Sequence, residues 1–441
     1  MKGKIEFSFY MSIGLGMAMA TSAYTMIADL FAIAGAFWVL AGVVLAAVFC
    51  MVIALSIGEL ASMFPSAPGV RTYFKVAFGD RASLVLLYLY LIFVVLIAGL
   101  ETFVFSQVVL AVFPASIPVL TVFGMIAFVL IINLLGFQLP RSAQIGTTML
   151  AIVLIIVTGV AALFHSKTSL VFSGHHADGW RTALNLPALA GTSIFLYTGF
   201  EWVTPLGLRP KAYERKIPFS MPAVVLLLCI VYSLFVLGAA SQLSPEAISA
   251  TPTPQVSYFS ALYGGIGPYV ALALSVLSLF STFNAGVLGG SQLIYMLARE
   301  RKLPEWCGAL SVRTGVPLGA IFLLGGLATL AGIVVVMFRL EILAGLVGAS
   351  IMCLVYAAFM LAAIRLRRQK PNLVRSFRNP VLEVIQWALA AILLLIGTST
   401  LFSEPRYWRC VIGLLLSVVL AWTLSYLSGS NPALEKQRAA S

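Results

Sequence analysis

The sequence contains few charged residues. Only 10% of its 441 positions are Asp, Glu, Lys or Arg, whereas 61% are hydrophobic. A water-soluble protein of this length carries much more charge, so the composition predicts that most of the chain is embedded in a membrane. The alternation of polar and apolar residues that is typical of membrane strands is also missing, which argues against a β-barrel and favours an all-α membrane protein.

Motifs of enzymes and of metal or nucleic-acid sites are missing as well. The five cysteines form no CxxC pair and no Cys/His spacing suited to a metal. HExxH, G-x-S-x-G and P-loop patterns are absent, so neither hydrolysis nor nucleotide binding has a set of residues. No basic stripe with interleaved aromatic residues suggests nucleic acid. We therefore expect no enzyme activity, no cofactor, no metal and no nucleic-acid partner.

Long apolar runs, by contrast, fill the chain. A helix needs about 20 apolar residues to cross a bilayer, and twelve runs meet that length. They lie near residues 7–30, 32–63, 82–113, 117–136, 142–164, 184–208, 218–241, 268–298, 316–338, 341–365, 381–402 and 406–428. We number them spans 1 to 12 in chain order.

Basic residues are distributed unevenly among the connections between these spans. If the N-terminus is inside, 22 of the 27 Lys and Arg residues fall inside, and the outer side keeps Lys167, Arg181, Arg339, Arg406 and Arg409. Cytoplasmic loops carry the excess of Lys and Arg in membrane proteins. The pattern therefore predicts a multi-pass protein of an inner or plasma membrane, with an even number of spans and both termini in the cytoplasm.

Two spans contain residues that weaken a helix. Span 1 includes Gly14 and Gly16, and span 6 includes Gly191, Gly199 and Pro205. These are the first spans of two consecutive five-span blocks, and paired interruptions at matching positions indicate a transporter site near the bilayer midplane. Broken helices offer N–H and C=O groups there, which attract the two opposite charges of an amino acid. The alternative is that small residues only allow helices to pack closely.

Several stretches resemble the amino acid–polyamine–organocation family of permeases. "GELASMFPSAPG", which begins beside Glu59, is similar to a family stretch after span 2, and Gly199, Phe200 and Glu201 match the family's G-F-E. "YMLARERKLPEW" and "RSFRNP" are similar to two further family motifs in the expected order. The similarity runs from Ile5 to about residue 426. It implies a core of two inverted five-helix repeats with discontinuous spans 1 and 6, plus two additional helices.

The resemblance also implies a domain organisation and a function. Residues 1–164 form the first repeat, 184–365 the second, 381–428 the two additional spans and 429–441 a cytoplasmic tail. The function is secondary active transport of an amino acid or related small amine by alternating access, coupled to protons or by exchange. An antiporter of cationic amino acids or polyamines is the alternative. A channel belongs to a different class, and its selectivity loop or ring of charges is not found.

The clamp for the substrate carboxylate is expected in span 1. Family members commonly have G-S-G or a close relative in the break of this span, whose backbone amides hold the carboxylate. Here the nearest match is Ala20, Thr21 and Ser22. Gly14 and Gly16 are the alternative location of the break.

Further substrate contacts are expected in spans 6 and 8. By resemblance, Phe195 is an aromatic lid over the substrate, next to the break at Gly199. Tyr197 and Thr198 supply polar contacts. Asn284 in span 8 either faces the substrate or joins helices.

Three acids are candidates for coupling or gating. Glu101 lies well inside span 3, where an acid indicates function by default. It is a proton carrier, a partner of a cationic substrate, or a structural acid bonded to Gln107 or a neighbouring span. Glu201 either caps freed amides, bridges the broken helices or carries a proton. Glu59 is placed at the cytoplasmic end of span 2, in a gate or structural role.

Sodium is a second possible coupling ion beside the proton. Some family members place a lysine in span 5 where others bind sodium, and here Ala151 falls at the nearest matching position. The adjacent hydroxyls of Ser281 and Thr282 in span 8, with freed carbonyls of span 1, form a possible sodium site. The alternative is that these hydroxyls bond to their own helix backbone.

Overall fold

The computed structural model describes residues 2–64, 69–136, 138–167, 189–206, 215–403 and 405–429. These residues are organised as helices, with no β-strand among them, so the all-α prediction is confirmed. In the same ranges nine helices are long and apolar enough to cross a membrane, and a bent pair of helices counts as a tenth. The predicted tail, 429–441, lies outside the described residues except for its first position.

The helices of the first half correspond to predicted spans 1 to 5. They are α1 (Lys2–Ala18), α2 (Ser22–Ile33), α3 (Ala36–Met63), the short α4 (Gly69–Phe78), α5 (Asp80–Val112), α6 (Pro118–Leu134) and α7 (Gln138–Phe164). α1 and α2 are the bent pair, and α6 is an apolar helix that is shorter than the helices counted as membrane spans.

The second half corresponds to predicted spans 6 to 12. Residues 189–195 are helical and lead into the 3₁₀ helix η1 (Phe200–Leu206). Then follow α9 (Ile217–Gln242), α10 (Pro245–Ser249), α11 (Pro254–Tyr263), α12 (Gly267–Arg299), α13 (Leu318–Phe338), α14 (Glu341–Gln369), α15 (Glu383–Thr400) and α16 (Tyr407–Gly429).

Both glycine-containing spans are interrupted. α1 ends at Ala18 and α2 begins at Ser22, and the two are bent by 49°. The second interruption falls at Gly199, whose φ of +116° is a conformation that only glycine adopts without strain. A Cβ there would lie 3.0 Å from the backbone carbon of Met17, so the two interruptions touch.

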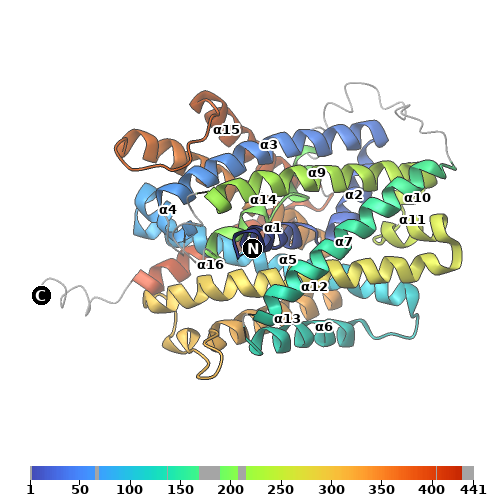
Figure 1. Cartoon of the computed structure of the whole chain (residues 1–441), viewed down its shortest axis with the longest axis horizontal. Coiled ribbons are helices and arrows are strands. Elements are labelled where there is room, and N and C mark those ends of the chain that lie inside the picture. The colour runs from blue at the N-terminus through green and yellow to red at the C-terminus, as the bar shows by residue number, and fades with distance from the viewer. Residues whose placement is uncertain are drawn as a thin grey trace, which may run out of the picture.

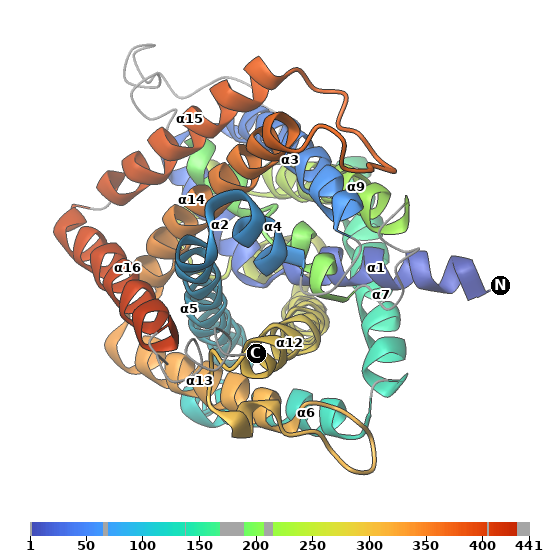
Figure 2. The ribbon, with the colours of Figure 1, turned by 90° about the vertical axis from the view of Figure 1, so that its left-hand side faces the viewer.

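The long helices run side by side (Figure 1), and the view along them shows α1 and α2 inside the bundle (Figure 2). α1 contacts α7, α9, α12 and η1, and its N-terminal end projects from the bundle between α7 and α9 (Figure 2). α15 and α16 lie on the outside, against α14 and α5. Large apolar side chains such as Leu120, Leu416 and Trp422 are exposed on the outer helices, as expected for surfaces that face lipid.

Candidate functional site

A small cavity lies where the α1–α2 interruption meets α5 and residues 195–198. We call it the central cavity. The residues that line it are Met17, Ala18, Ala20, Ser22, Ala23, Phe93, Ile97, Phe195 and Thr198. The structure thus brings together Ala20, Ser22, Phe195 and Thr198, four residues that the sequence predicts to bind substrate.

Glu101 holds the N-terminus of α2. Its carboxylate accepts the Thr21 N–H at 2.7 Å and the Ser22 N–H at 3.1 Å, and the side chain is fully buried. The first N–H groups of a helix have no partner within the helix and lie at the positive end of its dipole. Among the described residues no Lys or Arg pairs with Glu101. The backbone of α2 therefore stabilises this acid directly.

Glu201 bonds to the other interruption, at Gly199, and also to two neighbouring helices. One carboxylate oxygen accepts the hydroxyl of Tyr90 from α5 at 2.8 Å, and the other accepts the hydroxyl of Tyr356 from α14 at 2.8 Å and the Gly199 N–H at 3.1 Å. The carboxylate thus bonds to the break, to α5 and to α14 together. Neither tyrosine is identified by the sequence reasoning, because both look like ordinary apolar-span residues.

Gly14 and Gly16 lie inside α1, before the interruption at residues 19–21. A Cβ at Gly14 would lie 3.0 Å from Val224 of α9 and 3.1 Å from the carbonyl oxygen of Phe200, so this glycine permits close packing. A Cβ at Gly16 would collide with Gln144 and Ser281. Both glycines therefore bring α1 close to its neighbours and are not part of the central cavity wall.

Two other predicted contacts face away from the central cavity. Tyr197 donates its hydroxyl to the Val43 carbonyl of α3 at 2.9 Å. Asn284 donates its amide to Gln144 of α7 at 2.8 Å and accepts the Asn133 amide of α6 at 2.9 Å. Both side chains join helices in this structure.

Ser281 and Thr282 lie against α1 and α7. Thr282 donates its hydroxyl to the Gly16 carbonyl at 2.8 Å. Ser281 Oγ lies 2.6 Å from Thr148 Oγ1 and accepts the amide of Gln144 at 2.8 Å. The same Gln144 nitrogen donates to the Ser12 carbonyl at 2.9 Å. An uncharged amide donor thus reaches the oxygens of the predicted sodium site.

Gln144 and Thr148, not Ala151, are the α7 residues at this place. A signal for them is present in the sequence: two polar residues four positions apart lie on one face of a helix, within an otherwise apolar span. Sequence reasoning misses them because it looks only for a lysine.

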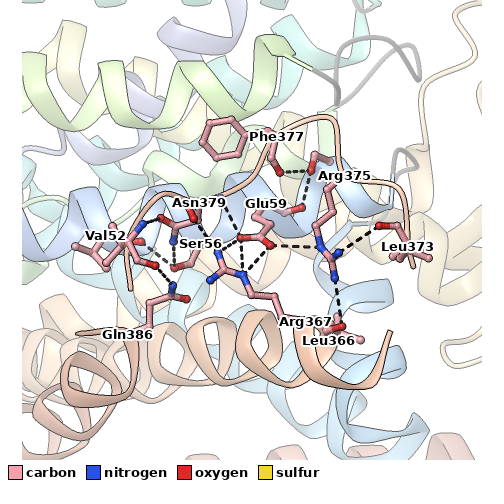
Figure 3. A network of polar contacts seen from close by, with 12 residues as sticks. Val52, Ser56, Glu59, Leu366, Arg367, Leu373, Arg375, Phe377, Asn379 and Gln386 are labelled. Carbon is pink, nitrogen blue, oxygen red and sulfur yellow. Dashed lines mark hydrogen bonds and ion pairs between the residues drawn. The ribbon is translucent and has the colours of Figure 1, made fainter. Parts of the chain in front are cut away.

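Glu59 belongs to a separate network of polar contacts (Figure 3), near the C-terminal ends of α3 and α14. It is fully buried and paired with Arg367 of α14, whose Nε donates at 2.8 Å. Arg375 lies 3.4 Å from the same carboxylate, and the Asn379 N–H donates to it at 3.1 Å. The network joins α3, α14 and the connection to α15. The walls of the central cavity contain none of these residues.

The sequence is similar to a family of amino acid permeases along most of its length. A family model described as amino acid permease matches residues 7–425. The amino acid permease YecA of Bacillus subtilis is 28% identical over 324 residues, which cover 70% of this chain and 73% of YecA. The human cystine/glutamate transporter is 26% identical over 285 residues, or 62% of this chain and 56% of that transporter.

A solved structure extends the likeness to the whole fold. A manganese transporter of Eremococcus coleocola superposes with a TM-score of 0.61 at 13% identity, covering 96% of this chain and 92% of the transporter. At this identity the likeness concerns the fold alone. The similar proteins are transporters and permeases, not enzymes.

Proposed function

We propose, from the premise that the chain belongs to the amino acid permease family, that this secondary transporter couples substrate binding to protonation of Glu101. The substrate is an amino acid or related small amine that occupies the central cavity. The observation that carries the proposal is the position of the Glu101 carboxylate, 2.7 Å from the Thr21 nitrogen and 3.1 Å from the Ser22 nitrogen.

The backbone N–H groups of Thr21 and Ser22 are suited to a carboxylate. A helix N-terminus combines free N–H donors with the positive end of the dipole, which makes it an anion site. Ser22 also lines the central cavity, so the same helix end faces a bound substrate. In the substrate-free protein the Glu101 carboxylate takes the place that a substrate carboxylate would occupy.

Two carboxylates cannot share these donors while both are charged, because like charges at contact distance repel strongly. No basic side chain among the described residues pairs with Glu101 to offset that repulsion. A proton on Glu101 removes one of the two charges and weakens its hold on the N–H groups. Each substrate carboxylate therefore enters with one proton, and both leave together on the other side.

The remaining candidates have supporting roles in this proposal. Phe195 lines the central cavity and is nearly buried, which suits a lid over the substrate. Glu201 stays in place, because Tyr90 and Tyr356 hold its two oxygens. Its role is to keep the second interruption open.

We extend the proposal to the architecture and its orientation. Twelve spans form two inverted repeats, 1–164 and 184–365, followed by the two spans of 381–428. In this count, residues 189–206 belong to span 6, which is interrupted, and α6 is span 4, which is short. The protein lies in a cytoplasmic membrane with both termini inside.

The test replaces Glu101 by glutamine, which keeps the shape and removes the titration. In liposomes with an inward proton gradient, Glu101→Gln should abolish accumulation of radiolabelled substrate, whereas exchange between substrate pools at equal pH should persist. The matched control is Glu246→Gln, which removes an exposed acid of α10 and should leave accumulation unchanged.

The same variant separates the other readings. Selective weakening of amine binding, with neutral amino acids spared, would support the antiporter of cationic amino acids or polyamines instead. Wild-type accumulation and wild-type pH profile in Glu101→Gln would contradict the proposal. A loss of thermal stability with unchanged specificity and pH profile in the remaining folded protein would make Glu101 a structural acid.

A further inference from the structure

A second and larger cavity adjoins the central one. It lies between α5, α6, α12 and α13. We call it the side cavity. Met17 and Ile97 line both cavities, so these two side chains form the wall between them.

The side cavity is apolar. Among the described residues that line it, Thr282 alone carries a polar side chain, and its hydroxyl is bonded to the Gly16 carbonyl. Apolar cavities of this kind stay dry, because a water there finds too few hydrogen-bond partners. An apolar group that enters therefore displaces no bound water and gains contacts with the walls.

The packing of the bundle leaves this space open. Ala98, Ile126 and Ala328 belong to a small cluster of buried residues that is separate from the main hydrophobic core. All three line the side cavity. The far wall of the cavity is therefore built by its own group of small and branched residues.

Met17 is the movable part of the wall. A Cβ added at Gly199 would lie 2.7 Å from Met17 Cγ, and one added at Gly286 would lie 4.0 Å from Met17 Sδ. The side chain thus runs from the interruption at Gly199 toward the side cavity. Methionine is unbranched and has several rotatable bonds, so it changes rotamer at low cost.

We propose that the side cavity receives the side chain of a large apolar substrate, and that Met17 moves aside to admit it. The inference rests on the proposed function, because it places the polar end of the substrate at the start of α2. It adds a substrate class: amino acids or amines with a long aliphatic or aromatic side chain, in preference to small or polar ones.

The test places a larger side chain in the side cavity without displacing the helices around it. Gly286 of α12 lines the cavity, and an added Cβ would have Met17 Sδ at 4.0 Å as its nearest neighbour. Gly286→Leu therefore places a side chain in the open space. The matched control is Gly326→Leu on the exposed face of α13, where an added Cβ meets nothing within 4 Å.

The measurement is stabilisation of the purified full-length protein by single amino acids, followed by competition for uptake in liposomes. The probes are L-leucine, L-phenylalanine and L-tryptophan against glycine and L-alanine. In the wild type the large apolar amino acids should bind more tightly than the small ones. Gly286→Leu should weaken binding of the large ones by about tenfold or more, since burial of such a side chain is lost, and should leave L-alanine within about twofold.

Several results would overturn the inference. Equal weakening of large and small amino acids in a folded Gly286→Leu protein would mean that the side cavity is not a side-chain site. Unchanged binding of all probes, with a change in lipid that co-purifies, would make the cavity a lipid site. A wild type that prefers small or polar amino acids would refute the substrate class but would leave the proposed function intact. The proposed function is tested separately, by the loss of proton coupling in Glu101→Gln.

Discussion

Glu101 and Glu201 each hold one of the two helix interruptions, but their bonding differs. Glu201 is held by two tyrosine hydroxyls from other helices as well as by the Gly199 N–H. Glu101 accepts N–H groups of Thr21 and Ser22, donors that a substrate carboxylate can also use. This difference in donors is the reason why we propose Glu101, and not Glu201, as the acid that exchanges its partner during transport.

Phe195 provides a test at the scale of one residue. Phe195→Ala should reduce the apparent affinity for substrate by about tenfold, because the aromatic contact with bound substrate is lost. The measurement is the concentration dependence of uptake. Removing a buried phenylalanine also costs about 3–5 kcal/mol of stability, so the effect on folding must be separated from the effect on binding.

Phe359 supplies the control for that separation. It is fully buried on α14 and packs against Phe74 of α4 at 4.7 Å between ring centroids, away from the central cavity. Phe359→Ala should lower thermal stability as Phe195→Ala does, but should leave the affinity of the folded protein unchanged. Unchanged uptake kinetics in Phe195→Ala would reduce Phe195 to a packing residue.

At the scale of elements, the network of Glu59 joins helices that are far apart in the sequence. Arg367→Ala leaves a buried carboxylate with Arg375 and one backbone N–H. Breaking a buried pair costs about 3–5 kcal/mol, and the loss here should fall near the lower end because Arg375 remains. We expect a clear drop in the melting temperature of the purified protein.

Arg368 is the matched control for this prediction. It pairs with Glu383 at 2.9 Å, but its side chain is 62% exposed. Exposed ion pairs contribute about 0–1 kcal/mol, so Arg368→Ala should change the melting temperature little. Equal drops for the two variants would show that the Glu59 network does not hold α3 and α14 together.

The elements themselves are largely predictable from sequence, but the contacts that hold the interruption of span 1 are not. Nine predicted spans coincide with the nine long helices found among the described residues, because about 20 apolar residues suffice to identify a membrane helix. In span 1 the resemblance places the break at Ala20, Thr21 and Ser22, with Gly14 and Gly16 as the alternative, and the helix is interrupted at residues 19–21. The backbone N–H groups that the break leaves without helix partners donate to Glu101, about 80 positions away. No local sequence pattern predicts such a contact.

The walls of the central cavity divide in the same way. Phe195 and Thr198 line it and are singled out from sequence because they lie close to Gly199, since glycine in an apolar span indicates an irregular backbone. Met17 and Ile97 in the cavity walls are not found, because apolar residues in apolar spans carry no signal. Gln144 is marked in the sequence by its polarity within an apolar span, but its partners depend on where α7 meets α1 and α12.

At the scale of the whole molecule, the distribution of charge predicts orientation. Cysteines introduced at Val312 and at Ala247 should be labelled from opposite sides of the membrane, Val312 from the cytoplasm and Ala247 from outside. Both positions are exposed, and of the five native cysteines four are buried, so background labelling should be low. Labelling of both positions by an impermeant maleimide from the same side would contradict the predicted topology.

The central claim is that a substrate carboxylate and a proton enter together at Glu101. The most direct measurement is calorimetric titration of the purified protein with the amino acid that best stabilises it, in two buffers with different ionisation enthalpies. At a pH where Glu101 is charged, the wild type should take up about one proton per substrate bound, and Glu101→Gln should take up none. Equal proton uptake by the two proteins, or none by the wild type at any pH, would contradict the claim.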